Sequence, residues 1–229
     1  MGLFGRILSG DLTFAGAVVY ILSSLAVIFL TLPVHEFAHA FTAVKLGDDT
    51  PRWQGRLSIN PFAHIDYLGA ACILLFGFGW AKPVGINANH FKNPKGGMAL
   101  TALAGPLANL IMALVSLVFY NMLSLLYMHA YLTVWLYIAF FFLYLAQINV
   151  YLAVFNLIPI PPLDGSRLLS ALLPYKQYYA LMRYERYLYF GLLALIVFGV
   201  LDVPLDYLSG AVMSGLSFVA RLPFALFGA

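Results

Sequence analysis

The sequence predicts an all-α membrane protein whose chain crosses the bilayer about five times. Hydrophobic residues make up 63% of the 229 residues, whereas charged residues make up only 9%. A soluble domain carries roughly 25% charged residues, so this chain has too few charges to cover a water-facing surface. Its apolar stretches are long, and connections rich in charge, Gly or Pro separate them. We therefore expect one membrane-embedded domain over residues 1–229, in contact with the lipid bilayer.

Five segments are candidates for spanning helices, because each holds a run of mostly apolar residues close to the ~20 that a crossing needs. They cover residues 13–44, 98–128, 131–157, 187–201 and 208–227. The first is longer than one crossing requires, which predicts a tilt, a kink near Pro33, or an end that emerges into water. The fourth is shorter than the usual length.

The region between the first two candidate helices, residues 47–97, differs in kind. Pro61, Pro83 and Pro94 interrupt any continuous helix there. We expect a re-entrant loop or short strands, since non-helical backbone at membrane depth persists only inside protein or beside a wet cavity.

The distribution of Lys and Arg predicts the orientation in the membrane. Residues 45–95 hold six basic side chains and residues 167–186 hold four, whereas the turn near residue 130 holds none. Basic connections stay on the cytosolic side. We therefore expect an integral protein of a prokaryotic cell (inner) membrane with its N-terminus outside, and the end of the first helix nearer the cytosolic face.

That end of the first helix carries His35-Glu36-Phe37-Ala38-His39, an H-E-x-x-H motif. Two imidazoles four residues apart share one helix face and can hold one zinc ion. Glu36 can take a proton from a zinc-bound water, whose pKa the metal lowers from 15.7 to about 7. The motif could be a polar face formed by chance, but ionisable residues inside a membrane helix are costly and usually functional. The motif therefore predicts metal-assisted amide hydrolysis.

A third zinc ligand is needed, because a catalytic zinc usually has three protein ligands and one open position. The single cysteine, Cys72, excludes a cysteine site. Asp164 is the best placed acid, since prolines end the helix before it and Gly165 permits a tight turn after it. The other candidates are Asp66, His64, His90 and His129.

Asn109 is a polar amide within an otherwise apolar helix. It could join helices by hydrogen bonding. It could also hold an extended substrate or donate to a developing oxyanion.

Five motifs in one order resemble the site-2 protease family of intramembrane zinc metalloproteases, over about residues 32–167. They are HEFAH at 35–39, GRLSINPFAHID at 55–66, GWAKPV at 79–84, AGPLAN at 104–109 and NLIPIPPLDG at 156–165. The resemblance implies a three-helix catalytic core within about residues 13–167, with additional C-terminal helices at about 187–227. It implies one zinc ion on His35, His39 and Asp164, with Glu36 as the catalytic base and Asn109 near the substrate. The chain is similar to the compact branch that lacks soluble regulatory domains.

The expected function is therefore that of a zinc endopeptidase that cleaves peptide bonds in or near transmembrane segments, as in regulated intramembrane proteolysis. Its expected partners are a transmembrane protein or peptide substrate, the lipid bilayer and a separate regulatory partner. No nucleic-acid motif is present. The alternative is a metal-binding membrane protein without peptidase activity, such as a transporter or assembly factor. Glu36 favours the enzyme, because metal transport needs no general base beside its ligands.

Overall fold

The computed structural model describes residue 10 and residues 13–76 and 79–227, and this part of the chain contains helices and loops but no strand. Four of its helices are long and apolar enough to cross a membrane. These findings confirm the prediction of an all-α polytopic membrane protein.

The first spanning helix is continuous from Phe14 to Lys45. It consists of α2 (Phe14–Ala26), a π-helical turn η1 (Val27–Thr31) and α3 (Leu32–Lys45). Its 32 residues extend about 48 Å, well beyond a hydrocarbon core of about 30 Å. The irregular turn η1 ends two residues before Pro33, close to the predicted kink, because Pro33 has no N–H to donate to the preceding turn.

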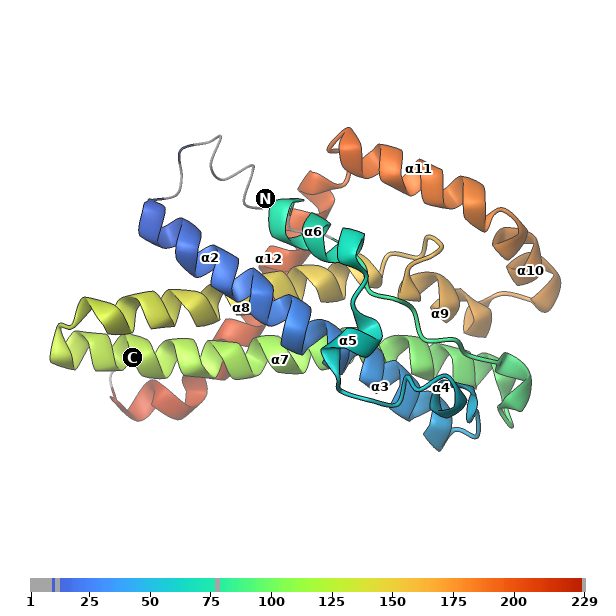
Figure 1. The fold of residues 1–229 in the computed structure, drawn as a ribbon, viewed down its shortest axis with the longest axis horizontal. Helices are drawn as coiled ribbons and strands as arrows, with labels where there is room; N and C mark the ends of the chain where they lie inside the picture. The colour runs from blue at the N-terminus through green and yellow to red at the C-terminus, as the bar shows by residue number, and fades with distance from the viewer. Residues whose placement is uncertain (1–9, 11–12, 77–78, 228–229) are drawn as a thin grey trace.

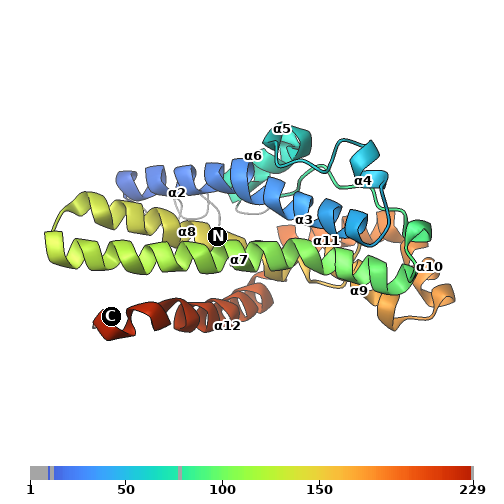
Figure 2. The ribbon, with the colours of Figure 1, turned by 90° about the horizontal axis from the view of Figure 1, so that it is seen from below.

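The second and third spanning helices, α7 (Pro94–Ala130) and α8 (Thr133–Asn156), form an antiparallel hairpin. Tyr131 adopts a left-handed conformation at the tight turn between them. The continuous helix α2–α3 packs on one side of this hairpin, and α12 (Asp202–Arg221) packs on the other (Figures 1 and 2).

One apolar core lies between α2, η1 and α8 and includes Val27 and Leu152. A second lies between α7, α8 and α12 and includes Leu117, Val150 and Leu205. The hairpin is therefore the middle layer of the bundle, and it fixes α3 in place through α7.

The prediction of a fourth spanning helix at residues 187–201 is wrong. The helix there is α11 (Glu185–Val197), whose 13 residues extend only about 20 Å. Gly199 has a φ of 68°, which ends the helix before the apolar run is finished. Among the described residues the count is therefore four helices of spanning length. The short helix follows α9 (Asp164–Leu172) and α10 (Tyr175–Arg183) at one end of the bundle.

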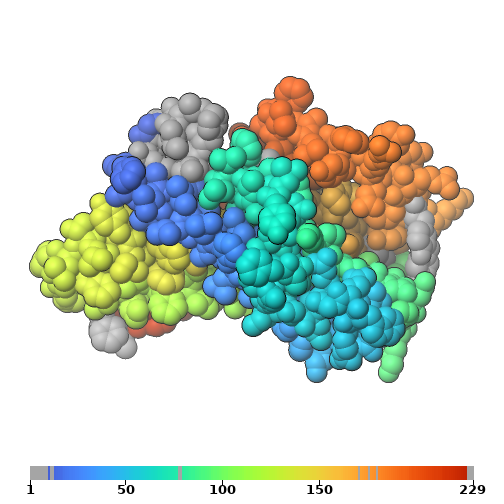
Figure 3. Space-filling model, viewed as in Figure 1, coloured from blue at the N-terminus to red at the C-terminus, as the bar shows by residue number. Residues whose placement is uncertain are grey.

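The region 47–97 contains short helices, and its described residues show no strand. The helices are α4 (Thr50–Trp53), α5 (Pro61–His64), α6 (Tyr67–Phe76) and the 3-10 turn η2 (Ala88–His90). Helix α6 is apolar, but its ten residues extend only about 15 Å, too short to cross. The extended residues 79–87 then lead back towards α7. This region and helices α10 and α11 cover neighbouring parts of one face (Figure 3).

Candidate metal centre

Three side chains from two separate helices converge near the end of α3. The distance is 3.0 Å between His35 Nε2 and His39 Nε2. Asp164 Oδ2 lies 3.1 Å from His39 Nε2 and 3.3 Å from His35 Nε2. Ligand atoms about 2.0–2.1 Å from a tetrahedral zinc ion lie roughly 3.3–3.4 Å from one another. The three atoms therefore have nearly the spacing of ligands around a single zinc ion.

A backbone carbonyl of α7 orients the second histidine. His39 Nδ1 lies 2.7 Å from the carbonyl oxygen of Thr101. Because a carbonyl can only accept, Nδ1 carries the hydrogen and donates it, which leaves a lone pair on Nε2. Metal-binding histidines commonly have their second nitrogen held in this way.

The space beside the histidines depends on Gly105 of α7. A Cβ atom at position 105 would overlap His39 Nε2 and lie 2.6 Å from His35 Nε2. Glycine therefore leaves room beside the three converging atoms. Two imidazoles and a carboxylate are also a donor set that catalytic zinc sites use. Both the donors and the free space fit a zinc ion.

The turn between α8 and α9 brings Asp164 to this group. A Cβ at Gly165 would overlap the carbonyl oxygen of Leu157, so α9 can begin directly against the end of α8 only with glycine there. The predicted tight turn after Asp164 is wrong, because Gly165 lies within α9 and has no positive φ; glycine is needed there for close backbone contact instead. Burial raises the pKa of the Asp164 carboxyl, but the neighbouring His39 and His35 outweigh burial and hold this pKa well below its usual range.

A cavity of about 250 Å³ opens beside the three residues. Its walls come from α3, residues 79–84, the end of α8, α9 and α11. Glu36 lines this cavity, and its carboxylate has no hydrogen-bond or ion-pair partner within the described part of the chain. Glu36 is therefore available to a water molecule or a substrate.

The other candidate ligands lie elsewhere and have other partners. Buried His64 has Nε2 2.7 Å from the carbonyl oxygen of Ser58. Asp66 accepts from the N–H of Gly69 at 2.9 Å. Among the described residues, only His35, His39 and Asp164 form a group of three ligands close enough for one metal ion.

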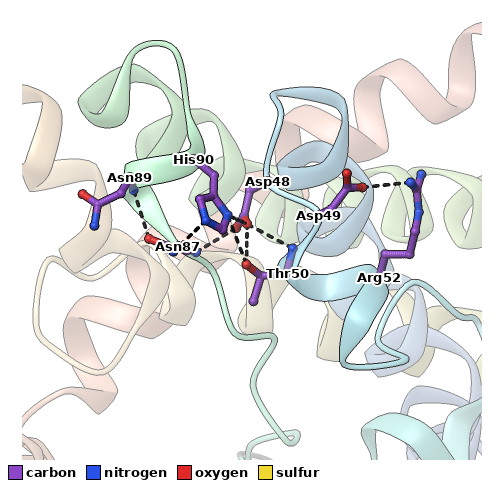
Figure 4. Close-up of polar contacts among 7 residues, drawn as sticks. All are labelled: Asp48, Asp49, Thr50, Arg52, Asn87, Asn89 and His90. Atoms are coloured by element: carbon purple, nitrogen blue, oxygen red, sulfur yellow. Dashed lines mark hydrogen bonds and ion pairs between the residues drawn. The ribbon is translucent and has the colours of Figure 1, made fainter.

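His90 belongs to a different polar cluster, in which its Nδ1 lies 2.8 Å from Asp48 Oδ1 (Figure 4). His129 is exposed near the end of α7. Neither histidine approaches the metal group.

Asn109 lies one helical turn after Gly105 on the same face of α7. Its side chain is buried, and neither its Nδ2 nor its Oδ1 atom has a hydrogen-bond partner among the described residues. It does not line the cavity beside the metal group. Its contact with substrate therefore stays a prediction.

Several wall residues of the cavity were not anticipated from the sequence. Helix α11 contributes one face, formed by residues 189, 192, 193 and 196. This spacing is a helical signal that the sequence contains. Arg167, one turn after Asp164, also lines the cavity. The contact of His39 with the Thr101 carbonyl could not be read from the sequence, because every residue has a backbone carbonyl.

The fold and the site define a polytopic membrane protein with two buried histidines, a partly buried aspartate and an adjacent glutamate, the arrangement of a membrane metalloprotease. The sequence pattern of peptidase family M50 matches residues 121–199, which include Asp164. "Putative zinc metalloprotease YwhC" of Bacillus subtilis (strain 168) is 43% identical over 165 residues, which cover 68% of this chain and 73% of that protein.

Two mycobacterial relatives are both named "Putative zinc metalloprotease Rip2". The protein of Mycolicibacterium smegmatis is 33% identical over 59% of this chain and 51% of its own length. The protein of Mycobacterium tuberculosis (strain Erdman) is 30% identical over 75% of this chain and 68% of its own length. No solved structure matches the chain.

The chain therefore belongs to peptidase family M50, the site-2 protease family, and is a zinc metallopeptidase of membranes. The predicted enzyme class and zinc cofactor are confirmed. The comparisons favour the enzyme over the transporter and assembly-factor alternatives.

Proposed function

We propose that this chain is an intramembrane endopeptidase that hydrolyses peptide bonds in or near the transmembrane segments of membrane proteins, as in regulated intramembrane proteolysis. One observation carries the proposal. His35, Glu36 and His39 lie within the first candidate span and face a cavity in the same helix bundle. A segment that reaches this cavity from the lipid would be a membrane segment of the substrate.

We assign one zinc ion per chain to His35 Nε2, His39 Nε2 and Asp164 Oδ2, and we assign the role of general base to Glu36. When bound, zinc supplies an activated water and polarises a carbonyl. Glu36 accepts the proton of the attacking water and then donates it to the leaving amine. Its unpaired carboxylate on the cavity wall supports this role.

A substrate helix must unwind before hydrolysis, because its own hydrogen bonds occupy its carbonyl groups. We propose that Asn109 holds the unwound segment. Its amide oxygen and nitrogen have no partner among the described residues, so both can bond to a peptide backbone. Asn109→Ala should lower kcat/KM while the zinc content is unchanged.

We also propose that the N-terminus is outside and the site is nearer the cytosol, in a prokaryotic cell membrane. The basic residues of 45–95 begin at the end of α3, and those of 167–186 follow Asp164 in the sequence. A reporter fused at Lys92 should be cytosolic, and one at Tyr131 should be outside. The same proposal includes a separate regulatory partner that controls the access of substrates to the site.

The test uses purified protein in proteoliposomes with a single-span membrane substrate. The substrate carries one tag at each end, and mass spectrometry locates the cut. We expect a cut in or near the spanning segment that depends on zinc. Cleavage confined to water-exposed tails far from the span would contradict the proposal.

A further inference from the structure

Arg167 is an unpaired cation on the wall of the cavity that holds Glu36. It lies on α9, three residues after Asp164, and is partly buried. Among the described residues, its guanidinium has no ion-pair or hydrogen-bond partner. A guanidinium offers five N–H donors and no acceptor, so it needs oxygen partners that the described part of the chain does not supply.

The position of Arg167 is unfavourable for the fold in three ways. It lies in the first turns of α9, where the helix dipole favours negative charge. It shares a cavity with the three residues that fit a zinc ion, whose positive charge would repel it. Partial burial also costs free energy for a charge without a partner.

Neighbouring acids do not remove this cost. Asp164 Oδ2 lies against His39 and His35 at 3.1 and 3.3 Å, and no ion pair joins Arg167 to Asp164 or Glu36 in the described structure. Much of the remaining wall is apolar and includes Leu32, Val84 and Leu152. The stability of the fold therefore gives no reason for a cation at this point.

We propose that Arg167 is a specificity-determining residue that binds a carboxylate of the substrate. The inference rests on the proposed function, and it names a substrate class: segments with Asp or Glu close to the scissile bond. A planar guanidinium can bind a carboxylate through two parallel hydrogen bonds. A lysine at the same substrate position would be repelled by Arg167, and a neutral residue would leave its charge unpaired. A free terminal carboxylate at that position offers the same chemistry as an acidic side chain.

The experiment uses amidated peptides that contain one spanning segment and differ at a single position near the cut. Asp, Asn or Lys is placed at each of the four positions on either side of the bond. At one or two positions, kcat/KM should be about tenfold higher for Asp than for Asn, and lowest for Lys. A neutral peptide with a free terminal carboxylate at that position distinguishes the two sources of the carboxylate.

Variants of Arg167 then test whether it carries the preference. Arg167→Glu should reverse the order of kcat/KM, so that the Lys peptide is cleaved faster than the Asp peptide. Arg167→Gln should abolish the preference for Asp, and Arg167→Lys should retain it. Arg183→Glu is the matched control, because Arg183 is exposed on α10 and does not line the cavity. It should leave the preference intact.

Binding gives a readout that does not depend on turnover. Fluorescent versions of the peptides are titrated into Glu36→Gln and into the Glu36→Gln/Arg167→Gln double variant, with zinc content measured for each. Only the variant that keeps Arg167 should bind the Asp peptide more tightly than the Asn peptide.

Two results would overturn the inference. The first is equal kcat/KM for the Asp, Asn and Lys peptides at every position. The second is a preference for the Asp peptide that survives in Arg167→Gln. Cleavage of the neutral peptide would still support the proposed endopeptidase in either case. If no peptide is cleaved, the proposed function fails, and the binding titration alone decides the role of Arg167.

Discussion

Gly105 of α7 lies so close to His39 of α3 that a Cβ atom at position 105 would overlap His39 Nε2. The same atom would lie 2.6 Å from His35 Nε2. The two helices therefore approach each other closely where the metal group lies, and the absence of one methyl group leaves space for an ion.

Gly105→Ala should displace the histidine rings and weaken zinc binding by on the order of 10–100-fold. The substitution itself favours a helix, so the fold should persist. Zinc content measured by mass spectrometry on the purified variant checks this. Gly215→Ala on α12 is the control, because a Cβ there would meet nothing within 4 Å. Equal zinc in the two variants would contradict the account of Gly105.

Asp164→Ala should remove most of the bound zinc and abolish activity, because it deletes the only ligand from outside α3. Asp66→Ala should keep most of the zinc, since Asp66 caps α6 through the N–H of Gly69. The metal content of both variants is the measurement. Full zinc occupancy in Asp164→Ala together with loss in Asp66→Ala would move the third ligand to the region 47–97.

Asp48 joins the end of α3 to the segment before α7 (Figure 4). Its fully buried carboxylate accepts from the N–H of Thr50 at 3.0 Å, the N–H of Asn87 at 2.7 Å and His90 Nδ1 at 2.8 Å. Burial raises the pKa of Asp48, but these hydrogen bonds and that of the Thr50 hydroxyl outweigh burial and lower the pKa below 3.8. The stabilisation is therefore complete above the unfolded-state pKa of about 3.9 and is lost as the pH falls through the folded-state pKa.

Asp48→Asn should lower the free energy of unfolding by about 1–3 kcal/mol at pH 7, because an amide cannot accept all these hydrogen bonds. The difference from wild type should shrink as the pH falls below 4. Thermal unfolding in detergent across this pH range measures both effects. Asp49→Asn is the control, since Asp49 is half exposed and, among the described residues, forms its one ion pair with Arg52 on the surface. If the difference in free energy of unfolding between wild type and Asp48→Asn did not change with pH, the ionised Asp48 carboxylate would not be the source of the stabilisation.

Local spacing in the sequence predicts which side chains can share a helix face, and the structure brings three of the candidate ligands together as a possible metal group. His35 and His39 share a helix face by their spacing alone, and the prolines indicated that the helix ends before Asp164. The tight turn expected at Gly165 was wrong, because Gly165 lies within α9. Helix α11 was misjudged as a span because hydropathy does not register Gly199, which ends it through a positive φ. The carbonyl of Thr101 and the place of Arg167 on the cavity wall arise from tertiary packing, which no local pattern specifies.

The central claim is that Glu36 is the base of a zinc-dependent protease, and Glu36→Gln tests it most directly. Zinc content and cleavage of a membrane substrate are measured on the same purified sample. Glu185→Gln, at the other glutamate of the chain and exposed at the start of α11, is the control. We predict that Glu36→Gln keeps its zinc and loses about 10²–10⁴-fold in kcat, whereas Glu185→Gln retains activity. Zinc-loaded Glu36→Gln that cleaves at the wild-type rate would contradict the account.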